Sequence, residues 1–126
     1  MIGSGKVFAT LAVSDIEKGK EFYGGTLGLT QVDENPGGVG YESGGGSLFV
    51  YASPTAGTGE ATCAFWQVDD IDATVNELRG KGVTFEEYDL PDTTVENGIH
   101  SMGPMKAAWF KDPDGNILGL GVDPAA

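Results

Sequence analysis

Two stretches of this 126-residue chain follow one pattern, VSDIEKGKEF at residues 13–22 and VDDIDATVNEL at residues 68–78. In each stretch a valine ends a largely apolar segment, an aspartate follows two positions later, and isoleucine comes next. Aspartate favours the N-cap of a helix, because its carboxylate accepts hydrogen bonds from the free N–H groups of the first turn. The pattern therefore predicts the same strand-to-helix unit twice, with caps at Asp15 and Asp70.

The residues after each cap predict how far the two helices run. Apolar residues recur at helical spacing in both stretches, and glycines follow them. The first helix is expected to stop at Gly28, and the second to run through Arg79 and to stop within residues 80–82. A period near 55 residues with only two copies predicts a pseudo-symmetric domain rather than a solenoid.

Alternating apolar residues and turn signals predict the strands. They are expected at residues 6–13, 29–34, 38–43, 47–53, 62–68, 83–90, 106–111 and 116–122. Residues 91–104 are expected to form a long polar loop. The run Asp112–Asn116, which contains Pro-Asp-Gly, predicts a tight hairpin turn before the last strand.

Three segments together resemble the vicinal oxygen chelate superfamily, which includes glyoxalase I, bleomycin-resistance proteins and extradiol dioxygenases. They are LAVSDIEKGKEFYGGTLGL (11–29), AFWQVDDIDATVNELRGKGV (64–83) and AAWFKDPDGNILGL (107–120). The resemblance implies an α+β fold of two βαβββ modules, about 5–54 and 61–123, in a single domain 1–126. It also implies that the two modules form an open, barrel-like cleft and that the protein is a homodimer.

The resemblance also indicates where a metal would be held. Enzymes of the superfamily use up to four His or Glu ligands, and the matching positions here are Phe8, Phe49, Cys63 and Gly119. Phenylalanine and glycine side chains cannot bind a metal, and a single cysteine is not a site. We therefore expect no metal and no cofactor, and no metal-dependent glyoxalase or dioxygenase activity.

Without a metal, the same positions are expected to become the walls of a pocket for a small molecule. The expected ligand-binding residues are Phe8, Thr10, Phe49, Tyr51, Cys63, Phe65, Trp109 and Gly119. The glycines at 119 and 121 are expected to leave volume where a wall would close. The alternative is that the aromatic side chains fill the hollow and leave no cavity.

Two reactive side chains allow more than one interpretation. His100, the only histidine, could gate the pocket or donate a proton, or it could simply be solvated in the loop. Cys63, the only cysteine, could be a nucleophile, but no neighbouring base is evident, and a buried inert thiol is the simpler prediction.

The composition limits the classes of partner that the protein is expected to bind. Nineteen acidic residues against seven basic ones give a net charge of −12, which disfavours nucleic acid and favours a cationic ligand, or else only keeps the protein soluble. The single cysteine suits a reducing cytoplasm, and the longest early apolar run is too short to span a membrane.

The sequence thus predicts a metal-free, cytoplasmic protein that binds a small aromatic or cationic molecule. The alternatives are an enzyme of the same superfamily, of lyase, isomerase or dioxygenase type, and an interaction module with a filled cleft.

Overall fold

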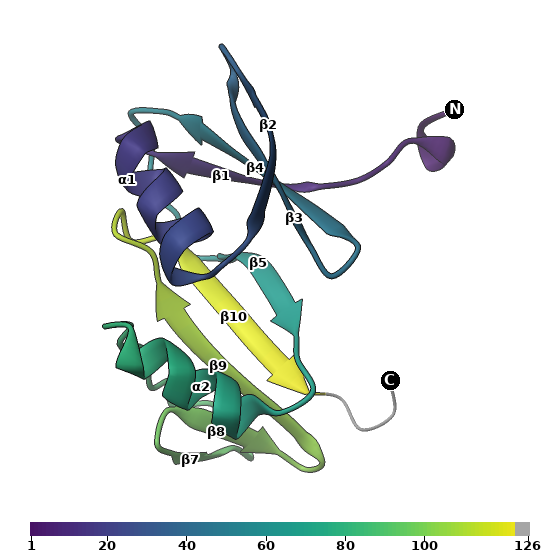
Figure 1. Ribbon diagram of the computed structural model, residues 1–126. Helices are drawn as coiled ribbons and strands as arrows, with labels where there is room; N and C mark the ends of the chain where they lie inside the picture. The colour runs from purple at the N-terminus through teal and green to yellow at the C-terminus, as the bar shows by residue number, and fades with distance from the viewer. Residues whose placement is uncertain (123–126) are drawn as a thin grey trace. The chain divides into compact units, whose positions relative to one another are not determined.

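A computed structural model describes residues 1–122 of the chain. The chain divides into two compact units, one comprising Met1–Gly59 and the other beginning at Glu60. Each unit has its own mixed sheet with one main helix against it, which gives the expected α+β class (Figure 1). The module limits 5–54 and 61–123 and their union in one domain remain predictions, and residue 123 lies outside the described residues.

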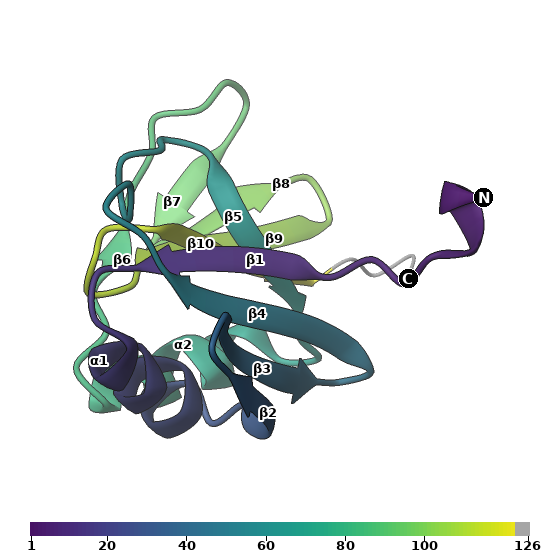
Figure 2. The same ribbon diagram turned by 90° about the horizontal axis from the view of Figure 1, so that it is seen from above.

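The first unit has the expected order βαβββ. Its elements are β1 (Ala9–Val13), α1 (Ile16–Lys20), β2 (Thr30–Asn35), β3 (Gly38–Ser43) and β4 (Gly46–Ala52). The strands lie in the order β1-β4-β3-β2, with β1 parallel to β4 and the other pairs antiparallel. Ahead of β1, residues 1–8 extend as an arm that contains a short 3-10 turn, η1 (Ile2–Ser4) (Figure 2).

The first helix is less regular than the sequence predicts. Asp15 caps it as expected, with Oδ1 accepting from the N–H of Glu17 at 2.9 Å. Beyond Lys20 the helix widens into a π-helical segment, η2 (Glu21–Thr26), and the chain leaves it at Gly28 with a φ of +74°. The wider turn buries two consecutive aromatic residues, Phe22 and Tyr23, whose rings meet edge to face at 5.1 Å.

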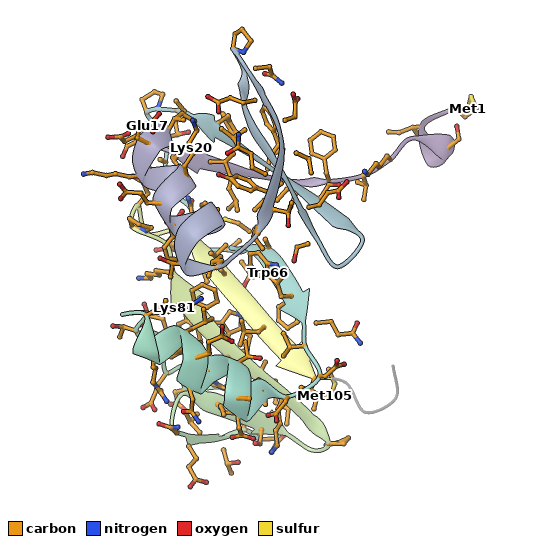
Figure 3. All side chains as sticks on the ribbon, in the orientation of Figure 1. Met1, Glu17, Lys20, Trp66, Lys81 and Met105 are labelled. Atoms are coloured by element: carbon orange, nitrogen blue, oxygen red, sulfur yellow. The ribbon has the colours of Figure 1, made fainter. Side chains whose placement is uncertain are left out.

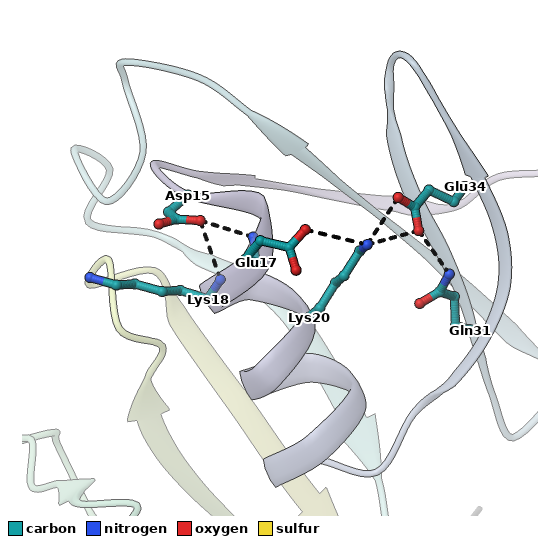
Figure 4. Close-up of polar contacts among 6 residues, drawn as sticks. All are labelled: Asp15, Glu17, Lys18, Lys20, Gln31 and Glu34. Atoms are coloured by element: carbon teal, nitrogen blue, oxygen red, sulfur yellow. Dashed lines mark hydrogen bonds and ion pairs between the residues drawn. The ribbon is translucent and has the colours of Figure 1, made fainter.

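A charged pair ties α1 to the edge strand β2. Lys20 Nζ lies 2.8 Å from Glu34 Oε1, and Glu17 lies 3.6 Å from the same ammonium (Figure 4). The hydrogen bond to Glu34 raises the pKa of Lys20 above its ordinary value, and the same bond lowers the pKa of Glu34.

The second unit repeats the order and adds two short strands. Its elements are β5 (Thr62–Gln67), α2 (Ile71–Gly80), β6 (Phe85–Glu86), β7 (Thr94–Glu96), β8 (Ile99–Met102), β9 (Met105–Lys111) and β10 (Ile117–Val122). The strand order is β5-β10-β9-β8-β7, and β6 also pairs with β9. Asp70 caps α2 as expected, with Oδ1 accepting from the N–H of Ala73 at 3.0 Å.

Two expectations for residues 83–104 are wrong. The expected strand 83–90 is only the two residues of β6, because β8 occupies the rest of the same edge of β9. The expected loop 91–104 contains the hairpin β7–β8, whose turn is Asn97-Gly98 with φ values of +57° and +78°. Asn-Gly is a strong signal for a two-residue hairpin turn, and the sequence analysis missed it.

Each unit buries one face of its sheet against its helix. In the first unit Leu11, Val13 and Val50 are at most 2% exposed, and in the second Phe110 and Leu118 are fully buried. Alternation along each strand therefore directs the next residues to the opposite face, away from the helix.

The turn predicted at Asp112–Asn116 is confirmed. Asp112 is 5% exposed, and its Oδ1 accepts from the N–H groups of Asp114 at 3.0 Å and Asn116 at 2.8 Å. Its Oδ2 accepts from the side-chain amide of Asn116 at 2.8 Å, and Gly115 within the turn has a φ of +95°. This side chain fixes the register of β9 against β10.

No helix within residues 1–122 combines the length and the apolar character that a membrane span requires.

Candidate ligand-binding site

The face of the second sheet that is turned away from α2 brings three of the expected site residues together. Phe65 on β5 lies directly opposite Gly119 on β10, and Gly119 lies opposite Trp109 on β9. Directly opposed residues point to the same face of a sheet. Phe65, Gly119 and Trp109 therefore form one row across the strands.

The space above the two glycines of β10 is filled by the ring of Phe65. A Cβ at Gly119 would lie 2.7 Å from Phe65 Cδ2, and a Cβ at Gly121 would lie 2.6 Å from Phe65 Cζ. The glycines were expected to leave open volume, and the structure corrects this: they form a seat for an aromatic ring. An aromatic ring that covers a glycine on a neighbouring strand compensates for the missing side chain.

A groove runs beside this ring at the carboxyl-terminal end of β10. We call it the methionine groove; its volume is about 260 Å³, and it is lined by Phe65, Gln67, Met102, Met105, Lys106, Ala107, Gly121 and Val122. Phe65 is 54% exposed and Met105 is 47% exposed, and Figure 3 shows Met105 near the end of β10. Methionine side chains are flexible and polarizable, so such a groove adapts to the shape of an apolar ligand.

Trp109 belongs to an aromatic cluster that extends away from the groove. Its ring lies 5.0 Å from His100 and 5.6 Å from Tyr88, centroid to centroid, in edge-to-face contacts. Such contacts hold the indole in one orientation. Trp109 is therefore a fixed part of the surface.

His100 is buried, which corrects the expectation of a solvated loop residue. It is 0% exposed, and its Nε2 accepts from the backbone N–H of Tyr88 at 2.8 Å. Nδ1 therefore carries the proton and donates to the carbonyl oxygen of Gly98 at 3.2 Å. With both nitrogens bonded to the backbone, this histidine joins β8 to the segment after β6 and is not placed to gate a pocket or to transfer a proton.

Tyr88 packs against Trp109 beside the candidate site, and the sequence analysis missed it. Its hydroxyl oxygen is buried and has no hydrogen-bond partner within residues 1–122. Burial raises the pKa of this hydroxyl above its ordinary value, and the nearby Glu86 carboxylate raises it further while Lys111 opposes the shift. Nothing in the local pattern of residues 83–90 distinguishes Tyr88 from its neighbours.

Cys63 was expected to be buried, and it is exposed instead. Its Sγ donates to the carbonyl oxygen of Ala61 at 3.6 Å. The exposure follows from its place near the start of β5.

In the first unit Thr10, Phe49 and Tyr51 lie in the sheet, and Phe8 lies directly ahead of β1. Thr10 lies directly opposite Phe49, and two residues further along Ala12 lies opposite Tyr51. The rings of Phe8 and Phe49 meet edge to face at 6.5 Å. The structure thus groups the expected residues into one set per unit.

The four matched metal positions carry the wrong chemistry for the superfamily's metal. Phe49 and Gly119 occupy equivalent places, since each lies directly opposite the matching residue of the first strand of its unit, Thr10 or Phe65. Of Phe8, Phe49, Cys63 and Gly119, only Cys63 has a donor atom. Within residues 1–122, no three His, Cys, Asp or Glu side chains gather closely enough to hold a metal ion. The residues present do not fit the metal.

The chain belongs to the Glyoxalase/Bleomycin resistance protein/Dioxygenase superfamily, whose family model matches residues 7–120. Among curated proteins, no sequence matches this chain significantly.

Solved structures support the same assignment. TnmS3, an antibiotic binding protein from Streptomyces sp. CB03234, has 28% sequence identity and a TM-score of 0.72, with 97% of this chain and 98% of that chain covered. A glyoxalase/bleomycin resistance protein from the same strain has 28% identity and a TM-score of 0.66, with 92% and 98% covered. A glyoxalase family protein from Enterococcus faecalis shares the fold at 21% identity and a TM-score of 0.70, with 96% and 99% covered.

Proposed function

We propose that this protein binds a small, flat aromatic molecule non-covalently and without a metal, in the methionine groove of the second unit. The observation that carries this proposal is the half-exposed ring of Phe65, seated on two glycines at the edge of an apolar groove. An aromatic wall beside adaptable methionines suits a planar ligand. Because about 260 Å³ lies just below the range of roughly 300–1,000 Å³ for ligand pockets, the ligand is small.

The charge of the protein supports a neutral or cationic ligand. With a net charge of −12, the surface attracts cations and repels anions at long range. The same charge argues against nucleic acid as a partner.

Binding is favoured over catalysis. His100 has both ring nitrogens engaged with the backbone, and the matched metal positions offer one thiol between them. A structural relative with 28% identity is an antibiotic binding protein, which supports the same choice.

Other parts of the proposal concern the first unit and the protein's setting. The aromatic set of the first unit, Phe8, Phe49 and Tyr51 with Thr10, is proposed as a second ligand-contacting surface. A homodimer is also proposed, with the superfamily resemblance as its support, and so is a cytoplasmic location, with the single cysteine as its support. Light scattering at several protein concentrations tests the dimer.

The binding proposal is tested by a thermal-shift screen of small molecules that includes the flat cationic dye proflavine. A ligand that binds only the folded protein raises the unfolding temperature. We expect flat aromatic compounds among the hits, with the same shifts in EDTA. If excess EDTA abolished the shifts, or if no flat aromatic compound gave one, the proposal would be wrong.

A matched pair of variants locates the site. Met105→Ser should weaken binding of a hit about three- to tenfold by calorimetry, because it removes apolar contact in the groove. Val95→Ser removes an exposed apolar side chain of β7 that does not line the groove, and should leave binding unchanged. Equal affinities for the two variants would exclude this groove as the site.

A further inference from the structure

The seat under Phe65 is a patch of bare strand backbone on which one aromatic ring lies. Its floor is the bare backbone of β10 at Gly119 and Gly121, which carries no side chain on this face. Beside this floor, on β9, lie Trp109, whose Cδ1 would be 3.1 Å from a Cβ at Gly119, and the carbonyl oxygen of Lys106, 3.1 Å from a Cβ at Gly121.

The ring that occupies the seat is held on one side only. Phe65 is 54% exposed, so more than half of its surface has no protein contact. By contrast, Trp109 is fixed by edge-to-face contacts with two other rings, and Gly121 and Phe65 both line the methionine groove. Rotation of an exposed side chain about its χ angles is fast, so Phe65 can leave the seat without any change in the sheet.

We infer that Phe65 is an internal stand-in for the ligand: the flat ring of the bound molecule takes the seat over Gly119 and Gly121 when Phe65 swings out. This inference rests on the proposed function and names the part of the ligand that is recognised. Phe65 then acts as a selectivity residue, because a ligand must displace it and must lie flat on the same bare backbone. Flat aromatic cations pass this test, and cage-shaped aliphatic cations do not.

The inference predicts an unusual result for truncation of an aromatic site residue. Because Phe65 competes for the seat, Phe65→Ala should bind proflavine more tightly than the wild type does, by at least about fivefold, since an occupied seat reduces the fraction of competent protein. The affinities are measured by fluorescence titration at low protein concentration.

A second variant tests whether the gain comes from the seat itself. In Phe65→Ala/Gly121→Ala the new methyl group occupies the seat, and because the Phe65 ring is absent the protein should still fold. This variant should therefore lose the gain in affinity for proflavine. The matched control is Phe65→Ala/Gly80→Ala, because a Cβ at Gly80 meets nothing within 4 Å and should keep the gain. Thermal unfolding of all variants checks that each is folded.

The outcomes separate this inference from the proposed function. Tighter binding of proflavine by Phe65→Ala, reversed by Gly121→Ala and absent for the cage-shaped cation amantadine, supports it. If Phe65→Ala binds proflavine as tightly as the wild type or more weakly, the inference is wrong. The proposed function then stands, with Phe65 as an ordinary ligand contact. Absence of binding of proflavine and of every other flat aromatic compound by all variants overturns both.

Discussion

Each unit has a row of three directly opposed residues across its sheet, and the two units place the aromatic rings of this row on different strands. In the first unit the row across the sheet reads Thr10, Phe49, Gly40, with the large ring in the middle. In the second unit the corresponding row reads Phe65, Gly119, Trp109, with the glycine in the middle. The repeat therefore preserves the backbone and reverses the order of large and small residues.

In both units an aromatic ring covers a glycine on the next strand, but the glycines are required for different reasons. Phe49 lies over Gly38, whose φ is +155° and where a Cβ would collide with the carbonyl oxygen of Val50. At Gly121 the backbone angle is ordinary, and the first atom that a Cβ meets is the far end of the Phe65 ring. Gly38 of the first unit is thus required by the backbone, whereas Gly121 of the second unit is required by a side chain that can move.

The largest effect is expected for Gly38→Ala. Because a carbonyl oxygen cannot move aside as a side chain can, the substitution should lower the free energy of unfolding by about 3 kcal/mol or more. Urea unfolding followed by circular dichroism measures this change. A loss below about 1 kcal/mol would show that the strand adjusts, and the distinction between the units would fail.

The hairpin turns before the last strand of each unit also differ: one depends on backbone angles and the other on a side chain. In the first unit Gly44 and Gly45 turn the chain with φ values of +54° and +86°, whereas in the second the buried carboxylate of Asp112 accepts three hydrogen bonds. Asp112→Ala should therefore lower the free energy of unfolding by about 2 kcal/mol, because buried donors lose their acceptor.

Asp112→Asn is the matched control for this turn. Its side-chain oxygen can still accept from the two backbone N–H groups, so about half of the loss should be recovered. Equal losses for the alanine and asparagine variants in urea unfolding would show that charge, and not the acceptor, stabilises the turn.

A smaller effect is expected for Gly121→Ala. The ring of Phe65 can move away, so the free energy of unfolding should fall by only about 1 kcal/mol. Adding Phe65→Ala removes the closest contacts and, of the three nearest atoms, leaves only the carbonyl oxygen of Lys106 at 3.1 Å, so a double-mutant cycle should show coupling between the two sites. Strict additivity would mean that the ring and the glycine do not share space.

The smallest effect concerns the polar contact that joins each helix to the rest of its unit. In the first unit Lys20 pairs with Glu34, whereas in the second the guanidinium of Arg79 donates to the neutral carbonyl oxygen of Asn97 at 2.7 Å. The Glu34 pKa is lowered in the folded protein, so its contribution is present above the ordinary glutamate pKa and is lost as the pH falls through the lowered value.

Lys20→Met should remove the pH dependence of stability that comes from Glu34. The pKa of Glu34, followed by NMR titration of its side-chain carboxyl, should rise toward the ordinary value, whereas Arg79→Met should leave it unchanged. An unaltered Glu34 pKa in Lys20→Met would show that the ion pair does not persist in solution.

Most of the fold could be predicted from the sequence, because its signals are local. The caps at Asp15 and Asp70 and the turn at Asp112 act within a few residues, and each is found where the pattern placed it. The hairpin at Asn97-Gly98 was equally local and was overlooked. The shortness of β6 was not predictable, because it depends on how much of the β9 edge β8 occupies.

The candidate site was predicted only in part. Alternation placed Phe65 on the face away from the helix, and the resemblance added Gly119 and Trp109. In the structure these three residues lie in one row across the strands. His100 and Tyr88 pack against Trp109, which lies on a different segment of the chain from either of them, and periodicity carries no information about such contacts.

The sequence by itself determined the duplicated unit, its capped helices and its turns, and it excluded the superfamily's metal ligands from positions 8, 49 and 119. Only the tertiary structure decided what the glycines of the last strand are for. A missing side chain has no local signature that distinguishes an empty space from an occupied one. That distinction depends on which ring the neighbouring strand brings above it, and here the ring is that of Phe65.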